Sequence, residues 1–252
     1  MSSKDKLRKF RENEGFKCLY QPATEEVLGK DYHLKGKWNK EVFKNNNPIT
    51  IELGCGKGEY TISLAKMFPD RNFIGIDIKG ARLWKGAKQA TEEKMANVAF
   101  IRTRIEFIES IFSQNEISQI WITFADPQIK RERKRLTNPM FLERYKKFLS
   151  PCGIINLKTD SQFLHQYTKE CAKVNNLEIL EANSDIYNSG RADEILSIKT
   201  FYETYYIKKG LPISYIAFKI NSSLPLISPE WDEKYWEEEE YKSHGIVLAN
   251  KG

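Results

Sequence analysis

Residues 49–58 have the sequence ITIELGCGKG, and this stretch decides the fold. Its first five residues form a β-branched, apolar run that is typical of a buried strand. Three glycines follow at once, at positions 54, 56 and 58, and closely spaced glycines let the backbone approach a ligand. The spacing is G-x-G-x-G rather than the G-x-G-x-x-G of dinucleotide-binding proteins, because position 59 is Glu. On its own, this stretch is also compatible with a tight turn that has only a structural role and binds no ligand.

Downstream of this loop, short apolar strands alternate with helical segments of ten or so residues. Further strands are expected at residues 73–77, 98–101, 120–124, 154–157 and 177–180. Helices are expected at residues 60–68, 81–93, 105–112, 139–149 and 161–174. This alternation predicts an α/β fold with a mostly parallel sheet and helices on both faces. Ligands of such sheets bind beyond the carboxyl ends of the strands.

The composition of the chain limits the classes of protein to which it can belong. Its 252 residues, 40% hydrophobic and 12% aromatic, suffice for one full-sized α/β domain. No apolar run approaches the roughly 20 residues needed to cross a bilayer, and the first six residues are too polar for a signal peptide. Four separated cysteines and three scattered histidines favour neither a disulfide frame nor a zinc site. We expect a cytoplasmic protein without a bound metal or a membrane partner.

The charge is unevenly distributed. The net charge is +6, and residues 130–147 alone carry eight basic and two acidic residues, whereas residues 231–240 are mainly acidic. A solvated helix face would explain the basic run as well as an anion-binding surface does. We divide the chain into a basic N-terminal arm (1–45), a main domain (46–220) and an acidic tail (221–252).

Acidic residues stand at the ends of several predicted strands. Glu52 and Asp77 belong to the first two strands, and Asp77 follows Gly58 by 19 residues. A carboxylate at the place of Asp77 can accept hydrogen bonds from ribose hydroxyls. Carboxylates repel a pyrophosphate but attract a sulfonium ion, so S-adenosylmethionine fits these strand ends better than NAD.

Asp126 and Asp160 follow the next two strands. Asp126-Pro127 precedes the basic run, which suggests a reacting centre beside a polyanion. The alternative for Asp126 is a cap of a helix or a turn, and for Asp160 it is a cap of the helix that begins near Ser161.

Taken together, these strand ends resemble the bacterial tRNA (guanine-N7-)-methyltransferase family. The matching segments are residues 51–58, 74–77, 126–135, 157–160 and 200–203, the last followed by 210–213. The resemblance implies a Rossmann-like methyltransferase fold in which residues 212–220 add an antiparallel strand. It also implies S-adenosylmethionine as methyl donor and, as acceptor, N7 of a guanine in tRNA, at position 46 of the variable loop.

The motifs assign candidate residues, with Asp126 as the catalytic one. The candidates for cofactor binding are Glu52, Gly54, Gly56, Asp77, Asp126 and, after the third strand, Arg104 or Glu106. The candidates for substrate binding are Lys130, Arg133, Asp160, Thr200 and Glu203. We expect the whole run from Lys130 to Arg135, helped by basic residues of the arm, to hold tRNA phosphates. A monomer or weak homodimer is expected.

The chain departs from the family at two places. Gln128 stands where the family has a tryptophan, and the basic run contains no histidine. These losses motivate an alternative, a catalytically silent RNA-binding protein. A small-molecule methyltransferase or an NAD enzyme would leave the basic run unexplained.

Overall fold

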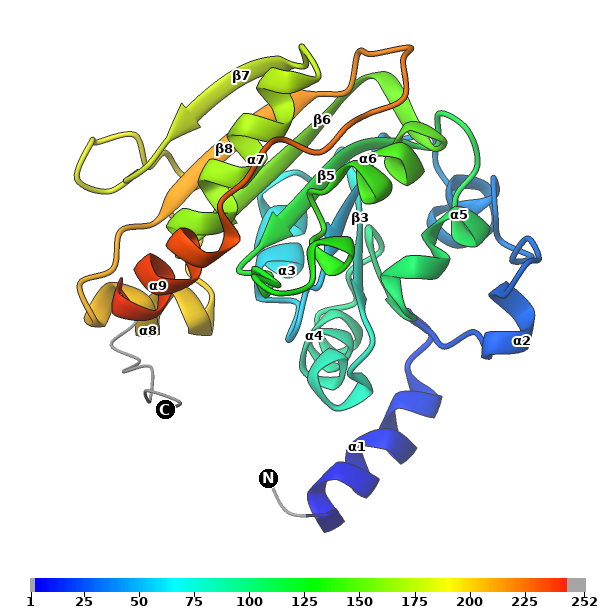
Figure 1. The fold of residues 1–252 in the computed structure, drawn as a ribbon. Helices are drawn as coiled ribbons and strands as arrows, with labels where there is room; N and C mark the ends of the chain where they lie inside the picture. Colours follow the sequence, from blue (N-terminus) through cyan, green and yellow to red (C-terminus); the bar gives the residue numbers. More distant parts are fainter. Residues whose placement is uncertain (1–2, 244–252) are drawn as a thin grey trace. The chain divides into compact units, whose positions relative to one another are not determined.

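The computed structural model describes residues 3–243, and Figure 1 traces their helices and strands. The chain forms two compact units. The first consists of the residues up to Thr123 together with Arg144–Gly153. The second consists of Phe124–Glu143 and of the residues from Ile154 onward.

A parallel sheet forms the centre of the first unit. Its five strands have the order β1-β4-β3-β2-β5. Their bounds are β1 (Leu19–Tyr20), β2 (Ile49–Leu53), β3 (Asn72–Asp77), β4 (Val98–Arg102) and β5 (Ile117–Thr123). Every residue of β2 and β3 is buried, as expected for strands covered on both faces. The chain steps outward from β2 to β4 and returns to β5 on the other side of β2, so the strand order reverses between β2 and β5.

Helices surround this sheet. They are α1 (Ser3–Gly15), α2 (Thr24–Val27), the π-helix η1 (Trp38–Phe43), α3 (Glu59–Met67), α4 (Gly80–Glu92), the 3-10 helix η2 (Ile105–Phe107) and α5 (Ile108–Ile111). Helix α4 packs on β3 and β4, and α1 packs on α4 (Figure 1). The side chain of Asn13 fixes α1 by donating to the carbonyl of Gly80 at 2.9 Å. The N-terminal arm is therefore helical and docked in its first part.

The second unit contains antiparallel strands and the C-terminal helices. Its elements and those that lead into it are η3 (Glu132–Lys134), α6 (Pro139–Lys146), β6 (Leu149–Thr159), α7 (Gln162–Val174), β7 (Glu178–Asn183), α8 (Phe201–Lys208), β8 (Ser214–Lys219) and α9 (Glu233–Ser243). Strand β8 runs antiparallel to both β6 and β7. Helix α7 packs on β7 and β8, and α9 packs on α7 (Figure 1). The α/β fold class, with a mostly parallel sheet and an antiparallel C-terminal strand, is confirmed.

The acidic tail is described as far as Ser243, and its last residues, 244–252, lie outside the described part. Leu226 is buried, and its backbone N–H donates to Glu143 at 2.8 Å. Ile227 and Asn175 exchange two hydrogen bonds of 2.8 Å. The tail is thus anchored to the second unit before α9 begins. Among the helices of the described residues, none has the length and apolar character that crossing a membrane requires.

Candidate active site

At three positions of the glycine loop between β2 and α3, the backbone has a conformation that only glycine adopts without strain. Gly54, Gly56 and Gly58 have φ angles of +76°, +57° and +72°, a region where a Cβ atom is unfavourable. The backbone N–H groups of Gly54 and Cys55 donate to the carbonyl of Ile76 on β3, at 2.8 and 3.0 Å. A Cβ added at Gly54 or Gly56 would meet no atom within 4 Å. These two glycines therefore leave space open above the loop.

Gly58 has a packing role as well. A Cβ at this position would lie 2.6 Å from the ring of Phe100, a fully buried residue of β4. Gly75 and Gly86 approach the same ring, with Cβ positions at 2.7 and 2.6 Å. Three glycines from a loop, a strand and a helix thus make room for one aromatic side chain. The third glycine of G-x-G-x-G allows α3 to start close to the sheet.

Glu52 is buried beneath the loop, with 3% of its surface exposed. Its Oε2 accepts hydrogen bonds from the backbone N–H of Thr61, at 2.9 Å, and from the Thr61 hydroxyl. Its Oε1 accepts a bond of 2.5 Å from the hydroxyl of Thr123 at the end of β5. Burial raises the pKa of Glu52 to about 7, against the opposing effect of the two threonines. Glu52 joins β2, α3 and β5, and it carries a proton part of the time near neutral pH.

Asp77 organises the ends of β3 and of the glycine loop. Its Oδ2 accepts from the backbone N–H of Gly56 at 2.9 Å, and its Oδ1 from that of Lys79 at 2.7 Å. Each carboxylate oxygen can accept a second hydrogen bond. The structure therefore brings Asp77 and Gly56 together, as the sequence predicts for a cofactor site, and leaves acceptor capacity on Asp77.

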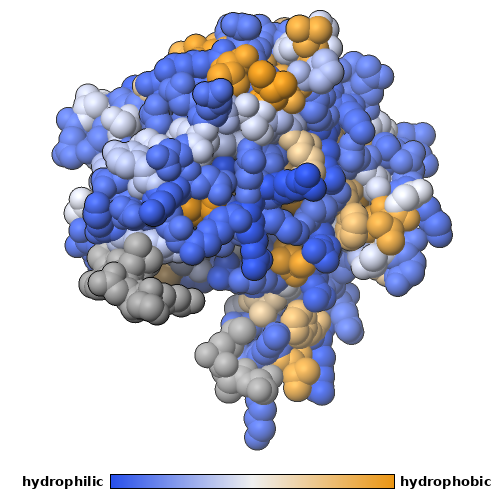
Figure 2. Space-filling view, in the orientation of Figure 1, coloured by the Kyte–Doolittle hydropathy of each residue, from blue (hydrophilic) through white to orange (hydrophobic). Residues whose placement is uncertain are grey.

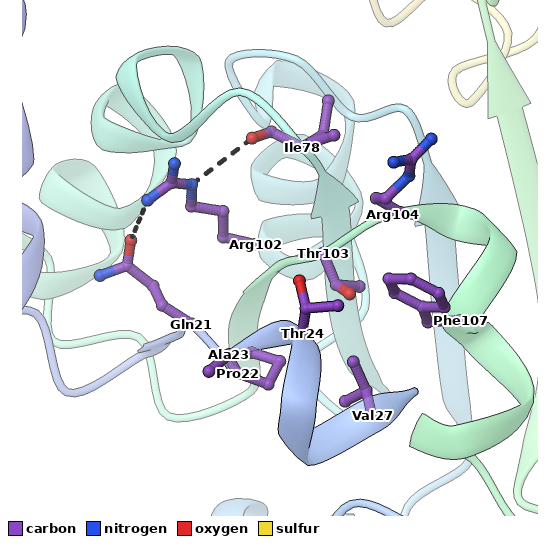
Figure 3. A pocket seen from close by; sticks show the side chains of 10 residues that line it. All are labelled: Gln21, Pro22, Ala23, Thr24, Val27, Ile78, Arg102, Thr103, Arg104 and Phe107. Atoms are coloured by element: carbon purple, nitrogen blue, oxygen red, sulfur yellow. Dashed lines mark hydrogen bonds between the residues drawn. The ribbon is translucent and has the colours of Figure 1, made fainter. Parts of the chain in front are cut away.

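A pocket opens at the carboxyl ends of β3 and β4 (Figure 3). Its volume is about 370 Å³. The residues that line it are Gln21, Pro22, Ala23, Thr24, Val27, Ile78, Arg102, Thr103, Arg104 and Phe107. One wall comes from the segment around α2, and Arg102 ties this wall to the strand ends. Its guanidinium donates to the side chain of Gln21 at 3.3 Å and to the carbonyl of Ile78 at 3.5 Å.

Of the two candidates after β4, Arg104 lines this pocket and Glu106 does not line it. Arg104 Nη2 lies 3.8 Å from Glu106 Oε1, and the carbonyl of Glu106 accepts a hydrogen bond from Arg144. The sequence interpretation missed the other lining residues. Ile78 and Thr103 directly follow strands, so the rule of strand ends would have found them. The wall between Gln21 and Val27 carries no comparable signal.

Asp126 lies in the second unit, in the segment that follows β5. It is exposed, and its Oδ1 accepts from the backbone N–H of Gln128 at 3.0 Å. Asp126 therefore caps this turn, as the alternative interpretation of Asp126-Pro127 predicts. Phe124 and Gln128, on either side of it, have φ angles of +50° and +51°. Non-glycine residues in this region cost energy and cluster at functional sites.

The basic run after Asp126 divides into exposed and buried parts. Lys130 and Arg133 are exposed, as expected for phosphate-binding residues. Lys130 Nζ lies 2.6 Å from Glu237 Oε1 on α9. The surface at the place of α9 is hydrophilic in Figure 2. The prediction that Arg135 binds phosphate is wrong, because its side chain is 0% exposed.

Asp160 follows β6 and is half-buried. It does not cap α7, since the hydroxyl of Ser161 accepts from the backbone N–H of Leu164 at 3.0 Å. The alternative of a cap is therefore wrong for Asp160.

Thr200 and Glu203 form a capping box at the start of α8. Glu203 N–H donates to the Thr200 hydroxyl at 3.1 Å. Glu203 is fully buried, and its Oε1 lies 2.7 Å from Lys158 Nζ and accepts from the hydroxyl of Tyr187 at 2.6 Å. Lys158 also donates to the carbonyl of Leu196 at 2.6 Å. A buried network thus connects β6 with α8.

The described part of the chain contains no cluster of metal ligands. No group of three or more His, Cys, Asp and Glu side chains there has an arrangement that would hold a metal ion.

Sequence comparisons relate the chain to methyltransferases. A family model described as "Putative methyltransferase" matches residues 46–215. The tRNA (guanine-N(7)-)-methyltransferase of Christiangramia forsetii (strain DSM 17595 / CGMCC 1.15422 / KT0803) is 57% identical over 223 residues, which are 87% of this chain and 100% of that protein. The protein of the same name from Bacteroides fragilis (strain YCH46) is 48% identical over 227 residues, 90% of either chain.

Solved structures share the fold. The 16S rRNA methyltransferase KamB has a TM-score of 0.54 at 10% identity, covering 75% of this chain and 92% of that one. An antibiotic-related methyltransferase has a TM-score of 0.55 at 17% identity, covering 75% and 95%. At these identities the structures support the fold alone, whereas the sequence relatives show the family. The chain belongs to the tRNA (guanine-N(7)-)-methyltransferase family.

Proposed function

We propose that this protein transfers the methyl group of S-adenosylmethionine to N7 of a guanine in tRNA, at position 46 of the variable loop. Its membership in the family, over nearly the whole chain, is the observation that carries this proposal. We further propose that it acts in the cytoplasm, as a monomer or weak homodimer and without a metal ion.

The first unit offers features that suit the cofactor. Gly54 and Gly56 leave space above a loop that Asp77 holds in place. The pocket after β3 and β4 combines apolar side chains, such as Ile78 and Phe107, with hydroxyl groups, which suits a nucleoside. We assign the ribose to Asp77 and the adenine to the pocket that Arg104 lines. Glu52 adds a carboxylate to this site. A nearby cation favours the ionised form of such a group.

The reaction requires little acid–base chemistry from the protein. When bound, S-adenosylmethionine supplies a methyl group that is activated by the positive charge on sulfur. Guanine N7 has a free lone pair on the major-groove edge, so no residue has to remove a proton from it. The protein residues then act mainly by orienting the two reactants, which accounts for several kcal/mol of such barriers.

We propose that Asp126 stabilises the positive charge that develops on the purine during methyl transfer. A fixed carboxylate beside the ring favours the transfer of positive charge from sulfur to guanine. The exposed position of Asp126 in a constrained turn suits this task, because its carboxylate is available and its backbone is fixed.

Recognition of guanine is assigned to Asp160 and Glu203. Guanine presents two donors, N1–H and the exocyclic amine, where adenine presents an acceptor at N1 and a C–H group at C2, so two acceptors reject adenine. Glu203 Oε1 already accepts from Lys158 and Tyr187, and Oε2 accepts a bond of 3.4 Å from the backbone N–H of Thr200. The base would take the remaining acceptor position on Oε2. Because Glu203 is fully buried, this contact requires the start of α8 at Thr200 to shift. We assign tRNA phosphates to Lys130, Arg133 and the basic residues of α1.

The test is methyl transfer from labelled S-adenosylmethionine to unmodified tRNA, followed by nucleoside analysis. The proposal predicts label in 7-methylguanosine, and label in no nucleoside or in a different one would refute it. Calorimetry with S-adenosylmethionine addresses the alternative of a silent RNA-binding protein, which has no reason to bind this cofactor.

A further inference from the structure

Arg135 contacts the loop of Asp126 from inside the protein. Its guanidinium donates to three consecutive backbone carbonyls, those of Pro127 at 3.2 Å, Gln128 at 3.3 Å and Ile129 at 2.8 Å. These are the residues that directly follow Asp126. A charged donor makes hydrogen bonds about twice as strong as those of neutral groups.

Aromatic rings enclose the same guanidinium. It lies 4.6 Å from the ring centroid of Phe163 and 4.3 Å from that of Tyr167, both on α7. Trp231 packs edge-on against both rings, at 5.6 and 5.4 Å. The Arg135 side chain is 0% exposed, and Glu233 Oε1 lies 3.5 Å from its Nη2. Stacking and burial restrict the guanidinium to one orientation.

The loop that Arg135 holds has a backbone that needs support. Phe124 and Gln128 adopt positive φ angles on either side of Asp126. Residues other than glycine keep such angles only where the surroundings impose them. The three carbonyl contacts of Arg135 supply this constraint at one end of the loop, and a hydrogen bond of 2.9 Å from Phe124 N–H to the Lys158 carbonyl supplies it at the other.

We propose that Arg135 is a positioning residue, whose buried guanidinium fixes the Asp126 loop and so the place of the Asp126 carboxylate during methyl transfer. This inference rests on the proposed function in assigning Asp126 to catalysis. It separates Arg135 from the exposed basic residues of the same run, such as Arg133, which we assign to phosphates.

The two roles predict different kinetics. A misplacement of about 1 Å in catalytic groups costs on the order of 100-fold in rate, so Arg135→Lys should lower kcat at least tenfold. Its KM for tRNA and the salt dependence of tRNA binding should stay as in the wild type. Arg133→Ala, the matched control, should raise KM for tRNA and make the salt dependence shallower by about one unit of slope, with kcat near that of the wild type.

Chemical rescue tests the guanidinium itself. Arg135→Ala should leave a buried space beside the rings of Phe163 and Tyr167 in which free guanidinium ion can bind. Millimolar guanidinium should raise the kcat of Arg135→Ala by tenfold or more and should leave the kcat of Arg133→Ala unchanged.

Digestion with trypsin reports on the loop independently of methyl transfer. Cleavage after Lys130 and Arg131 should be at least fivefold faster in Arg135→Lys than in the wild type, at equal S-adenosylmethionine affinity.

The outcomes separate the two proposals. If the wild type does not methylate tRNA, the proposed function fails, and the trypsin experiment still reports on the loop. Unchanged kcat in Arg135→Lys, or a shallower salt slope, would make Arg135 a phosphate contact and overturn the inference. Loss of S-adenosylmethionine affinity in proportion to kcat, without guanidinium rescue, would also overturn it, since it would indicate general misfolding.

Discussion

Lys158 and Glu203 form an ion pair, with 2.7 Å between Nζ and Oε1, and neither side chain is exposed to solvent. The pair joins β6 to the first turn of α8, so the candidate substrate residues Asp160 and Thr200 depend on a common buried support. Burial lowers the pKa of Lys158, and the neighbouring Glu203 opposes this effect. The charge on Lys158 therefore depends on its partner.

Removing one member of the pair should destabilise the protein strongly. Glu203→Gln leaves the Lys158 ammonium buried without a countercharge, and breaking a buried pair in this way costs about 3–5 kcal/mol. We expect a fall of this size in the free energy of unfolding, measured by urea titration. The control is Glu178→Gln, which breaks the partly exposed pair with Lys219 and should cost less than about 1 kcal/mol. The double variant Lys158→Met/Glu203→Gln should be more stable than Glu203→Gln, and equal losses in all three would contradict this account.

Glu52 should make stability depend on pH. Its pKa is raised by burial, from 4.5 in the unfolded chain to about 7 in the fold. The folded state then binds more protons than the unfolded state between these values, so the contribution of Glu52 to stability falls as the pH rises from about 4.5 to 7. The loss amounts to roughly 3 kcal/mol at most.

Comparison with Glu52→Gln isolates this group. The difference in unfolding free energy between the variant and the wild type should shift in favour of the variant as the pH rises from 5 to 8. A difference that stays constant over this range would show that Glu52 keeps an ordinary pKa.

Gly58→Ala should be more harmful than alanine at another glycine with a similar φ. The new Cβ would lie 2.6 Å from the Phe100 ring, so overpacking of about 1–3 kcal/mol adds to the backbone strain. Gly29, with φ +68° and no atom within 4 Å of its Cβ position, is the control for strain alone. Adding Phe100→Leu should recover part of the loss in Gly58→Ala, and calorimetric melting measures all three. Equal losses of stability in Gly58→Ala and Gly29→Ala would show that Gly58 has no packing role.

Glu237→Gln should strengthen tRNA binding at low salt. The carboxylate of Glu237 lies 2.6 Å from Lys130 and raises its pKa, chiefly through their hydrogen bond. A phosphate must compete with this carboxylate for Lys130, and exposed ion pairs are weak, so we expect an affinity gain of at most about fivefold. Glu239→Gln removes the same charge from α9 but frees Lys242 instead. Filter binding should show a larger gain for Glu237→Gln, whereas equal gains would mean that only net charge matters.

The sequence predicted the parallel core well because its signals are local. Residues 73–77 and 98–101 are short apolar runs bounded by polar turns, and they correspond to β3 and β4 within one residue at each end. The helix expected from residue 139 begins there as α6, directly after Asn138, whose side chain accepts from the backbone N–H of Phe141 at 3.0 Å. Such features depend only on neighbouring residues.

The features that the sequence did not predict depend on distant partners. Arg135 looks like its exposed neighbours in sequence, and only Phe163 and Tyr167, about 30 positions away, explain its burial. Glu237 belongs to a run of acidic residues that resembles a solvated tail, and its pairing with Lys130 follows from tertiary structure. Periodicity and composition carry no information on such contacts.

The position of the methyl group on tRNA is the decisive measurement for the proposed reaction. 7-Methylguanosine makes the RNA chain cleavable by borohydride reduction and aniline, so the length of the fragments locates it. The account predicts one cleavage, at position 46, in tRNA treated with the wild-type protein and S-adenosylmethionine. It predicts none with Asp126→Ala or with a transcript that has adenine at position 46. Cleavage at another guanine, or undiminished cleavage with Asp126→Ala that folds as the wild type does, would contradict it.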